Sequence, residues 1–213
     1  MRDLILFRHG NTFDAGQEPT RLGCRNDLPM TPSGEVQAQA GAQALVALAQ
    51  RPQALYAPHL KRTWRFAQIL GEALNLAPQP DDRLIELDYG AWSGLTDPQI
   101  AQRFGADHLE GWNKRGLWPL QDGWGESEDI VAARTRAFAE YVATLPGDGP
   151  VIGVSSAGTL RFFLRLVPGA FQNAIEQSLL KVKTGHAAHL RWQNGGWALL
   201  GWNIPPDRLS QGI

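Results

Sequence analysis

Short apolar runs alternate with amphipathic stretches along most of the chain. The run Leu4-Ile5-Leu6-Phe7 stops at a polar, glycine-containing turn, which is the pattern of a short buried strand. Thr31-Pro32 is a typical helix start, and the apolar positions from Val36 to Leu48 follow it with helical spacing. The pattern therefore predicts a strand followed by a helix at the beginning of this sequence.

The alternation of strand and helix continues towards the C-terminus. Asn194-Gly195-Gly196 separates the last two predicted strands, as a hairpin turn does. This order predicts an α/β fold with a mostly parallel central sheet, helices on both faces and a terminal antiparallel hairpin. The elements predicted after the first helix are a strand at 54–56, helices at 60–74 and 127–145, a strand at 151–154, a helix at 158–167, and strands at 186–193 and 197–203.

Residues 78–126 differ from the rest of the chain in their pattern. Glycine, proline and tryptophan are dense there, and helical spacing is weak except after Thr96-Asp97-Pro98-Gln99, which predicts a short helix. We interpret this segment as an inserted lid rather than a second domain. The sequence therefore predicts a single domain over residues 1–213.

The composition narrows the classes of partner. The chain has 20 Lys+Arg and 21 Asp+Glu, a net charge of −1, without the basic excess typical of nucleic-acid-binding proteins. No stretch approaches the roughly 18 apolar residues of a membrane helix, and the first apolar run is too short for a signal peptide. Cys24 is the one cysteine, so no intrachain disulfide forms. We expect a soluble, cytoplasmic protein that binds neither nucleic acid nor a membrane.

Polar residues follow two of the predicted strands, at the sheet edge where open α/β folds bind ligands. Arg8-His9-Gly10 follows the first strand, and Ser155-Ser156-Ala157-Gly158 follows the strand at 151–154. A histidine at a strand end can present one ring nitrogen to a substrate while the backbone holds the other, as a nucleophilic imidazole requires. Arg8 can bind phosphate oxygens through two donors, and Gly10 lets the backbone approach a ligand.

Four further motifs accompany Arg8-His9-Gly10-Asn11-Thr12 in a fixed order. They are the loop from Gly23 to Gly34, Ala57-Pro58-His59-Leu60-Lys61-Arg62, Leu84-Ile85-Glu86 with the glycines at 90 and 94, and Gly125-Glu126-Ser127. Together the five motifs resemble those of the histidine phosphatase superfamily, the phosphoglycerate mutase-like proteins, through most of the chain. Five motifs in the right order are far more specific than any one of them.

The resemblance implies a three-layer, phosphoglycerate mutase-like fold and a phosphomonoesterase that needs no metal and no cofactor. His9 would attack the phosphate ester and form a phosphohistidine, while Glu86 would protonate the leaving oxygen and later activate water. Arg8 and Arg62 would neutralise the charge on the phosphoryl oxygens. The implied partner is a small phosphorylated molecule.

Two positions depart from the family's pattern. The family's second histidine falls on Ser156 and an asparagine falls on Ala15, and both normally contact the transferred phosphoryl group. Turnover is therefore expected to be weakened or redirected, with Ser156 kept as a phosphate-binding candidate. Strand alternation along 186–192 puts His186 on the inward face at the same sheet edge. Our hypothesis is that His186 partly replaces the missing histidine.

Three other functions stay open. Gly153-Val154-Ser155-Ser156-Ala157 is similar to the nucleophile elbow of serine hydrolases, and Glu176 and His186 would then complete a triad with Ser155. The scaffold could instead bind phosphate or another anion without cleaving it. A phosphoglycerate mutase would need a pocket that protects its phosphoenzyme from water. The terminal edge hairpin is compatible with a homodimer.

Overall fold

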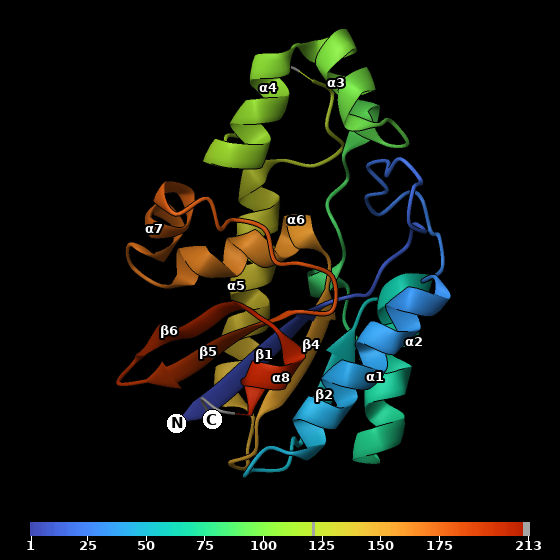
Figure 1. The fold of residues 1–213 in the computed structure, drawn as a ribbon. Helices are drawn as coiled ribbons and strands as arrows, with labels where there is room; N and C mark the ends of the chain where they lie inside the picture. Colours follow the sequence, from blue (N-terminus) through green and yellow to red (C-terminus); the bar gives the residue numbers. More distant parts are fainter. Residues whose placement is uncertain (121, 211–213) are drawn as a thin grey trace.

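A six-stranded sheet forms the centre of the molecule in the computed structural model, which describes residues 1–120 and 122–210 (Figure 1). Its strands are β1 (Arg2–Arg8), β2 (Ala54–Ala57), β3 (Gln79–Pro80), β4 (Val151–Ser155), β5 (Ala187–Gln193) and β6 (Gly196–Ile204), in the order β3-β2-β4-β1-β5-β6. The pairs β1–β4, β4–β2 and β2–β3 are parallel, and β1–β5 and β5–β6 are antiparallel. The predicted mostly parallel sheet with a terminal antiparallel hairpin is confirmed.

Helices lie on both faces of the sheet. They are α1 (Pro32–Val46), α2 (Lys61–Leu74), α3 (Asp97–Phe104), α4 (Ala106–Glu110), α5 (Glu128–Thr144), α6 (Ala157–Leu160), α7 (Ala170–Glu176) and α8 (Pro206–Leu209). In Figure 1, α1 and α2 cover one face and α5 lies against the other. The Thr31 side chain accepts from the backbone N–H of Gly34, so the predicted helix start at Thr31-Pro32 is confirmed as an N-cap.

The central strand β1 divides its side chains between two cores. Ile5 and Phe7 pack into the core under α1 and α2, whereas Leu4 and Leu6 pack into the core under α5. This alternation is the two-residue period of a strand that is buried on both faces. The continuous apolar run in the sequence is thus explained by a strand with a core on each side.

Several elements differ from the sequence-based expectations. Val36 is 62% exposed because α1 packs through smaller residues instead, among them Ala38 and Ala42. The helix expected at 158–167 is α6 followed by a 3-10 segment at Arg161–Leu166. The short helix α7 follows that segment and was not predicted.

The region above the sheet edge has its own apolar core. Figure 1 shows α3 and α4 together at the top, away from the sheet. Trp92, Ile100 and Trp112 are buried there, with further aromatic rings packed around them. An antiparallel bridge between Thr20 and Thr96 joins the loop after β1 to the start of α3. The interpretation of 78–126 as an inserted lid stays a prediction.

In the part of the chain that the structure describes, no helix is long and apolar enough to span a membrane.

Candidate active site

A cavity of about 260 Å³ opens at the carboxyl ends of β1 and β4. The end of β1 contributes Arg8 and His9, the first turn of α2 contributes Arg62, and the segment before α3 contributes Glu86. The structure therefore brings four of the six residues predicted for the site into one cavity. They come from positions 8 to 86 of the chain and meet because the carboxyl ends of the parallel strands β1, β4 and β2 lie at the same edge of the sheet.

Two hydrogen bonds hold His9, one through its backbone N–H and one through its ring. Its backbone N–H donates to the carbonyl of Ser155, 3.0 Å away. Its Nδ1–H donates to the carbonyl of Gly10 at 2.7 Å, which leaves Nε2 as the unprotonated ring nitrogen. Burial lowers the pKa of His9 well below its ordinary value, and the nearby Arg62 and Arg8 lower it further. The imidazole is therefore neutral at neutral pH, with a free lone pair on Nε2.

Two guanidinium groups, from the half-buried Arg8 and the buried Arg62, stand beside this imidazole. The Nη1 of Arg8 donates to the carbonyl of Val182 at 2.8 Å. Arg62 is 1% exposed and donates to the carbonyls of Asn26 at 3.0 Å and Gly23 at 2.7 Å. Burial lowers the pKa of both arginines, and attraction to a nearby carboxylate opposes that effect. Because a guanidinium remains protonated in proteins, these are two fixed positive charges in the cavity.

Glu86 lies against the start of α6. Its Oε1 accepts from the backbone N–H of Leu87 at 2.9 Å and of Thr159 at 3.0 Å, and its Oε2 accepts from that of Gly158 at 3.2 Å. A Cβ added to Gly158 would lie 2.6 Å from Oε1, so only glycine allows α6 to approach the carboxylate this closely. Glu86 is 6% exposed, and these hydrogen bonds hold its carboxylate in one orientation at the cavity.

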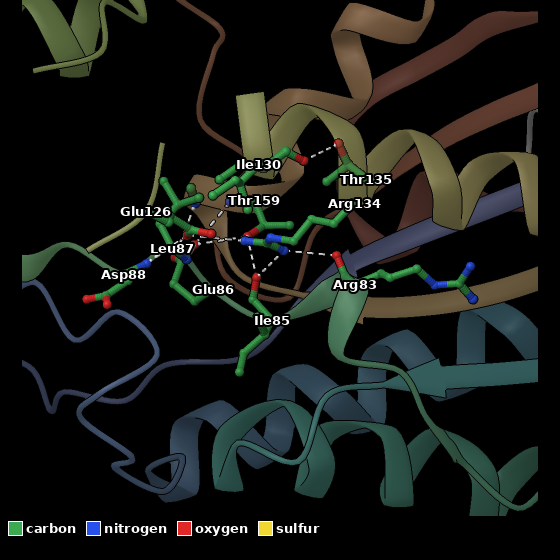
Figure 2. A network of polar contacts seen from close by, with 12 residues as sticks. Arg83, Ile85, Glu86, Leu87, Asp88, Glu126, Ile130, Arg134, Thr135 and Thr159 are labelled. Atoms are coloured by element: carbon green, nitrogen blue, oxygen red, sulfur yellow. Dashed lines mark hydrogen bonds and ion pairs between the residues drawn. The ribbon is translucent and has the colours of Figure 1, made fainter. Parts of the chain in front are cut away.

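A second layer of polar contacts positions the segment that carries Glu86 (Figure 2). Arg134 of α5 donates to the carbonyls of Arg83 at 2.9 Å and Ile85 at 2.7 Å, and it also reaches the hydroxyl of Thr159 at 3.3 Å. The Glu126 carboxylate accepts from the backbone N–H of Asp88 at 2.8 Å. Glu126 belongs to the Gly-Glu-Ser motif, so the structure places that motif behind the acid rather than in the cavity.

The other two predicted site residues do not line the cavity. Ser156 is 1% exposed, and its hydroxyl has no hydrogen-bond partner among the described residues; its neighbour Ala157 lines the cavity instead. His186 was expected on the inward face of the last strand pair, but β5 begins one residue later, at Ala187. The His186 ring nitrogen Nδ1 lies 3.1 Å from the carbonyl of Asn203, so this ring is turned to β6. His186 is therefore not among the residues that line the cavity, and its replacement of the missing histidine stays a prediction.

The residues of the serine hydrolase alternative are not assembled either. Ser155 is completely buried, and its hydroxyl donates to the carbonyl of Leu84 at 2.7 Å. Glu176 is an exposed residue of α7 that accepts from Gln172, four residues earlier on the same helix. A hydroxyl that is buried and already donating has no base to activate it. The structure thus gives Ser155 a structural role.

Two basic residues in the cavity were missed from the sequence. Arg21 lies in the loop after β1, and Lys181 lies between α7 and β5. Both segments are irregular, so no periodicity marked them. The available signal was the position of Lys181-Val182-Lys183 shortly before the strand that pairs with β1. Ala15, at the family's asparagine position, is exposed and does not line the cavity.

A neutral imidazole beside two fixed guanidinium groups on an α/β sheet edge is an arrangement suited to phosphoryl transfer. The chain belongs to the histidine phosphatase superfamily (branch 1), whose family model matches residues 4–205. The resemblance inferred from the five sequence motifs is therefore confirmed.

The similarity to known proteins of this type extends over most of the chain. Glucosyl-3-phosphoglycerate phosphatase of Mycobacterium tuberculosis (strain CDC 1551 / Oshkosh) is 33% identical over 168 residues, covering 75% of this chain and 72% of that protein. The probable phosphoglycerate mutase of Salmonella paratyphi C (strain RKS4594) is 27% identical over 212 residues, covering 96% and 91%. The structure of a mycobacterial glucosyl-3-phosphoglycerate phosphatase in complex with VO3 matches with a TM-score of 0.79 and 29% identity, over 96% of this chain and 100% of that chain.

Proposed function

We propose that this chain hydrolyses phosphate monoesters of small molecules through a phosphohistidine on His9. The observation that carries the proposal is the state of the His9 ring. Its Nδ1–H is fixed to the Gly10 carbonyl, and burial and two arginines keep the ring neutral, so Nε2 is available as a nucleophile. Membership of the histidine phosphatase superfamily supports the same reaction class.

In the first step, Nε2 of His9 forms a bond to phosphorus as the bond from phosphorus to the ester oxygen breaks. Arg8 and Arg62 supply positive charge to the phosphoryl oxygens, where charge spreads in the transition state. Glu86, in its protonated form, gives its proton to the leaving oxygen, and the free alcohol departs. The His9 ring then carries the phosphoryl group.

In the second step, water attacks the phosphohistidine. The Glu86 carboxylate, left ionised by the first step, takes the proton from the attacking water. The bond from Nε2 to phosphorus breaks, inorganic phosphate leaves and the neutral imidazole is restored. The hydrogen bonds from Leu87, Gly158 and Thr159 keep the carboxylate in place through both steps.

The test is hydrolysis of 4-nitrophenyl phosphate in the presence of a metal chelator by wild type, His9→Ala and a control variant. His59→Ala is the control, since His59 is an exposed histidine that stacks on Trp64 and does not line the cavity. We expect His9→Ala to lose about a thousandfold or more in kcat, as removal of a nucleophile does, and His59→Ala to match wild type. Acid quench of wild type should trap an acid-labile phosphoenzyme that His9→Ala lacks.

The second candidate function is anion binding without turnover. The departures at Ser156 and Ala15 favour it. The family's residues at these two positions normally contact the transferred phosphoryl group, whereas neither Ser156 nor Ala15 lines the cavity. Binding of inorganic phosphate by wild type, measured by calorimetry, with no hydrolysis of any aryl phosphate would establish this function and overturn the proposed hydrolysis.

A further inference from the structure

The two oxygens of the Glu86 carboxylate differ in the donors that hold them. Oε1 accepts from the backbone N–H of Leu87 at 2.9 Å and of Thr159 at 3.0 Å, and the Thr159 hydroxyl lies 3.3 Å from it. Among the described residues, Oε2 accepts a single hydrogen bond, from the N–H of Gly158 at 3.2 Å. A carboxylate oxygen offers about two lone-pair sites. Oε1 is therefore saturated, whereas Oε2 keeps a free site for a proton.

The Thr159 side chain links this arrangement to the segment that carries the acid. Thr159 is completely buried in α6, and its hydroxyl donates to the carbonyl of Ile85 at 2.6 Å. Ile85 is the residue before Glu86. Because Thr159 also supplies a backbone N–H to Oε1, this bond fixes the position of α6 relative to the carboxylate.

Arg134 of α5 determines the direction of the Thr159 hydroxyl (Figure 2). Its Nη2 donates to the hydroxyl oxygen at 3.3 Å, and its Nη1 donates to the Ile85 carbonyl at 2.7 Å. A hydroxyl has one proton, and a hydroxyl oxygen that accepts from a guanidinium points its proton away from that group. The Ile85 carbonyl and Oε1 of Glu86 are the acceptors within reach.

A proton on Oε1 would compete with the donors already there. It would occupy a lone pair that now accepts an N–H, and a buried N–H would lose its partner. This loss disfavours the Oε1-protonated form by about 5- to 150-fold. A proton on Oε2 can take the free lone pair without displacing the Gly158 N–H.

We propose that Thr159 is a positioning residue that assigns the proton of Glu86 to Oε2. The inference rests on the proposed function, in which Glu86 protonates the leaving oxygen. The bond from Oε2 to its proton breaks as the proton bonds to the ester oxygen, whose bond to phosphorus breaks. In the second step the attacking water returns a proton to Oε2. Without the Thr159 hydroxyl, Oε1 competes for the proton and the productive form is less populated.

Binding of vanadate and of inorganic phosphate, measured by calorimetry, tests this inference without turnover. Vanadate adopts the five-coordinate geometry of phosphoryl transfer and places an oxygen at the leaving-group position, whereas phosphate stays tetrahedral. We expect wild type to bind vanadate at least about 100-fold more tightly than phosphate. Thr159→Val removes the hydroxyl at nearly constant size and should lower this ratio about 3- to 10-fold. Thr159→Ser keeps the hydroxyl and should restore most of the ratio.

Thr135→Val is the matched control for the loss of a buried hydroxyl. Thr135 is 1% exposed, and its hydroxyl donates to the Val131 carbonyl at 2.8 Å within α5. This variant should keep the wild-type ratio. Kinetics give a second readout, since Thr159→Val should lose about 3- to 10-fold in kcat/KM on an alkyl phosphate. It should lose little on 4-nitrophenyl phosphate, whose leaving group departs without a proton.

Three results would overturn the inference: no vanadate preference in wild type, an unchanged ratio in Thr159→Val, or an equal loss in Thr159→Ser. The last result would assign the effect to packing of the threonine methyl group. The outcomes also separate this inference from the proposed hydrolysis. A vanadate preference that depends on the Thr159 hydroxyl, in a protein that hydrolyses no ester, would refute the hydrolysis alone.

Discussion

A methyl group added at Gly158 should disrupt the backbone hydrogen bonds that hold the Glu86 carboxylate. A Cβ at this residue would lie 2.6 Å from Oε1 of Glu86 and 2.4 Å from the hydroxyl oxygen of Tyr89. Both distances are well inside van der Waals contact, and both neighbours are buried. In Gly158→Ala, either α6 moves away from Glu86 or the carboxylate turns. Each movement breaks the backbone hydrogen bond from Gly158, and the bond from Thr159 is strained with it.

The size of the effect follows from these bonds. A hydrogen bond to a charged group contributes about 1.5–3 kcal/mol. Loss of one such bond from the oriented carboxylate corresponds to about a 10- to 150-fold loss in the step that uses Glu86. The loss should depend on the leaving group, because a good leaving group departs without protonation whereas an alkoxide needs the proton.

The assay is kcat/KM for a series of esters, from 4-nitrophenyl phosphate through phenyl phosphate to an alkyl phosphate. We expect Gly158→Ala to lose little on 4-nitrophenyl phosphate and the full factor on the alkyl ester. Gly196→Ala is the control, since a Cβ at Gly196 would meet nothing within 4 Å, and it should match wild type on every ester. An equal loss on all the esters would refute the assignment of Glu86 as proton donor, and no loss at all would refute the packing argument.

Two further predictions concern buried polar groups. Burial raises the pKa of Asp3, but hydrogen bonds from His189 and Arg191 outweigh it and lower the pKa from 3.8 to about 2, which corresponds to about 2 kcal/mol of stability. Because the folded-state pKa is the lower one, this stability is present above about pH 4 and is lost as the pH falls towards 2. The difference in urea unfolding free energy between wild type and Asp3→Asn should shrink over that range, and a constant difference would contradict the assignment. Ser155→Ala should cost about 1–3 kcal/mol of stability through the unpaired Leu84 carbonyl and keep its phosphatase activity; loss of activity in folded protein would reopen the serine nucleophile.

The sequence pattern predicts least well where residues outside helices and strands lie. Lys181 lines the cavity, and the carbonyl of the next residue, Val182, accepts a hydrogen bond from Arg8, which lies 174 positions away in the chain. His186 was placed by extending strand alternation one residue too far. The strand begins at Ala187, and the His186 ring bonds to Asn203. A shift of one residue is enough to turn a side chain to another face.

The sequence by itself determined the fold and the centre of the site. An apolar run that ends at Arg8-His9 predicts a buried strand with its polar residues at the sheet edge. This prediction succeeds because strand burial and chain direction are local properties of the pattern. Tertiary structure decided which side chains complete the site. Whether Glu86 touches α6, whether Ser156 faces the cavity and whether Lys181 lines it depend on packing between distant segments. Local hydrophobic periodicity carries no information on such contacts.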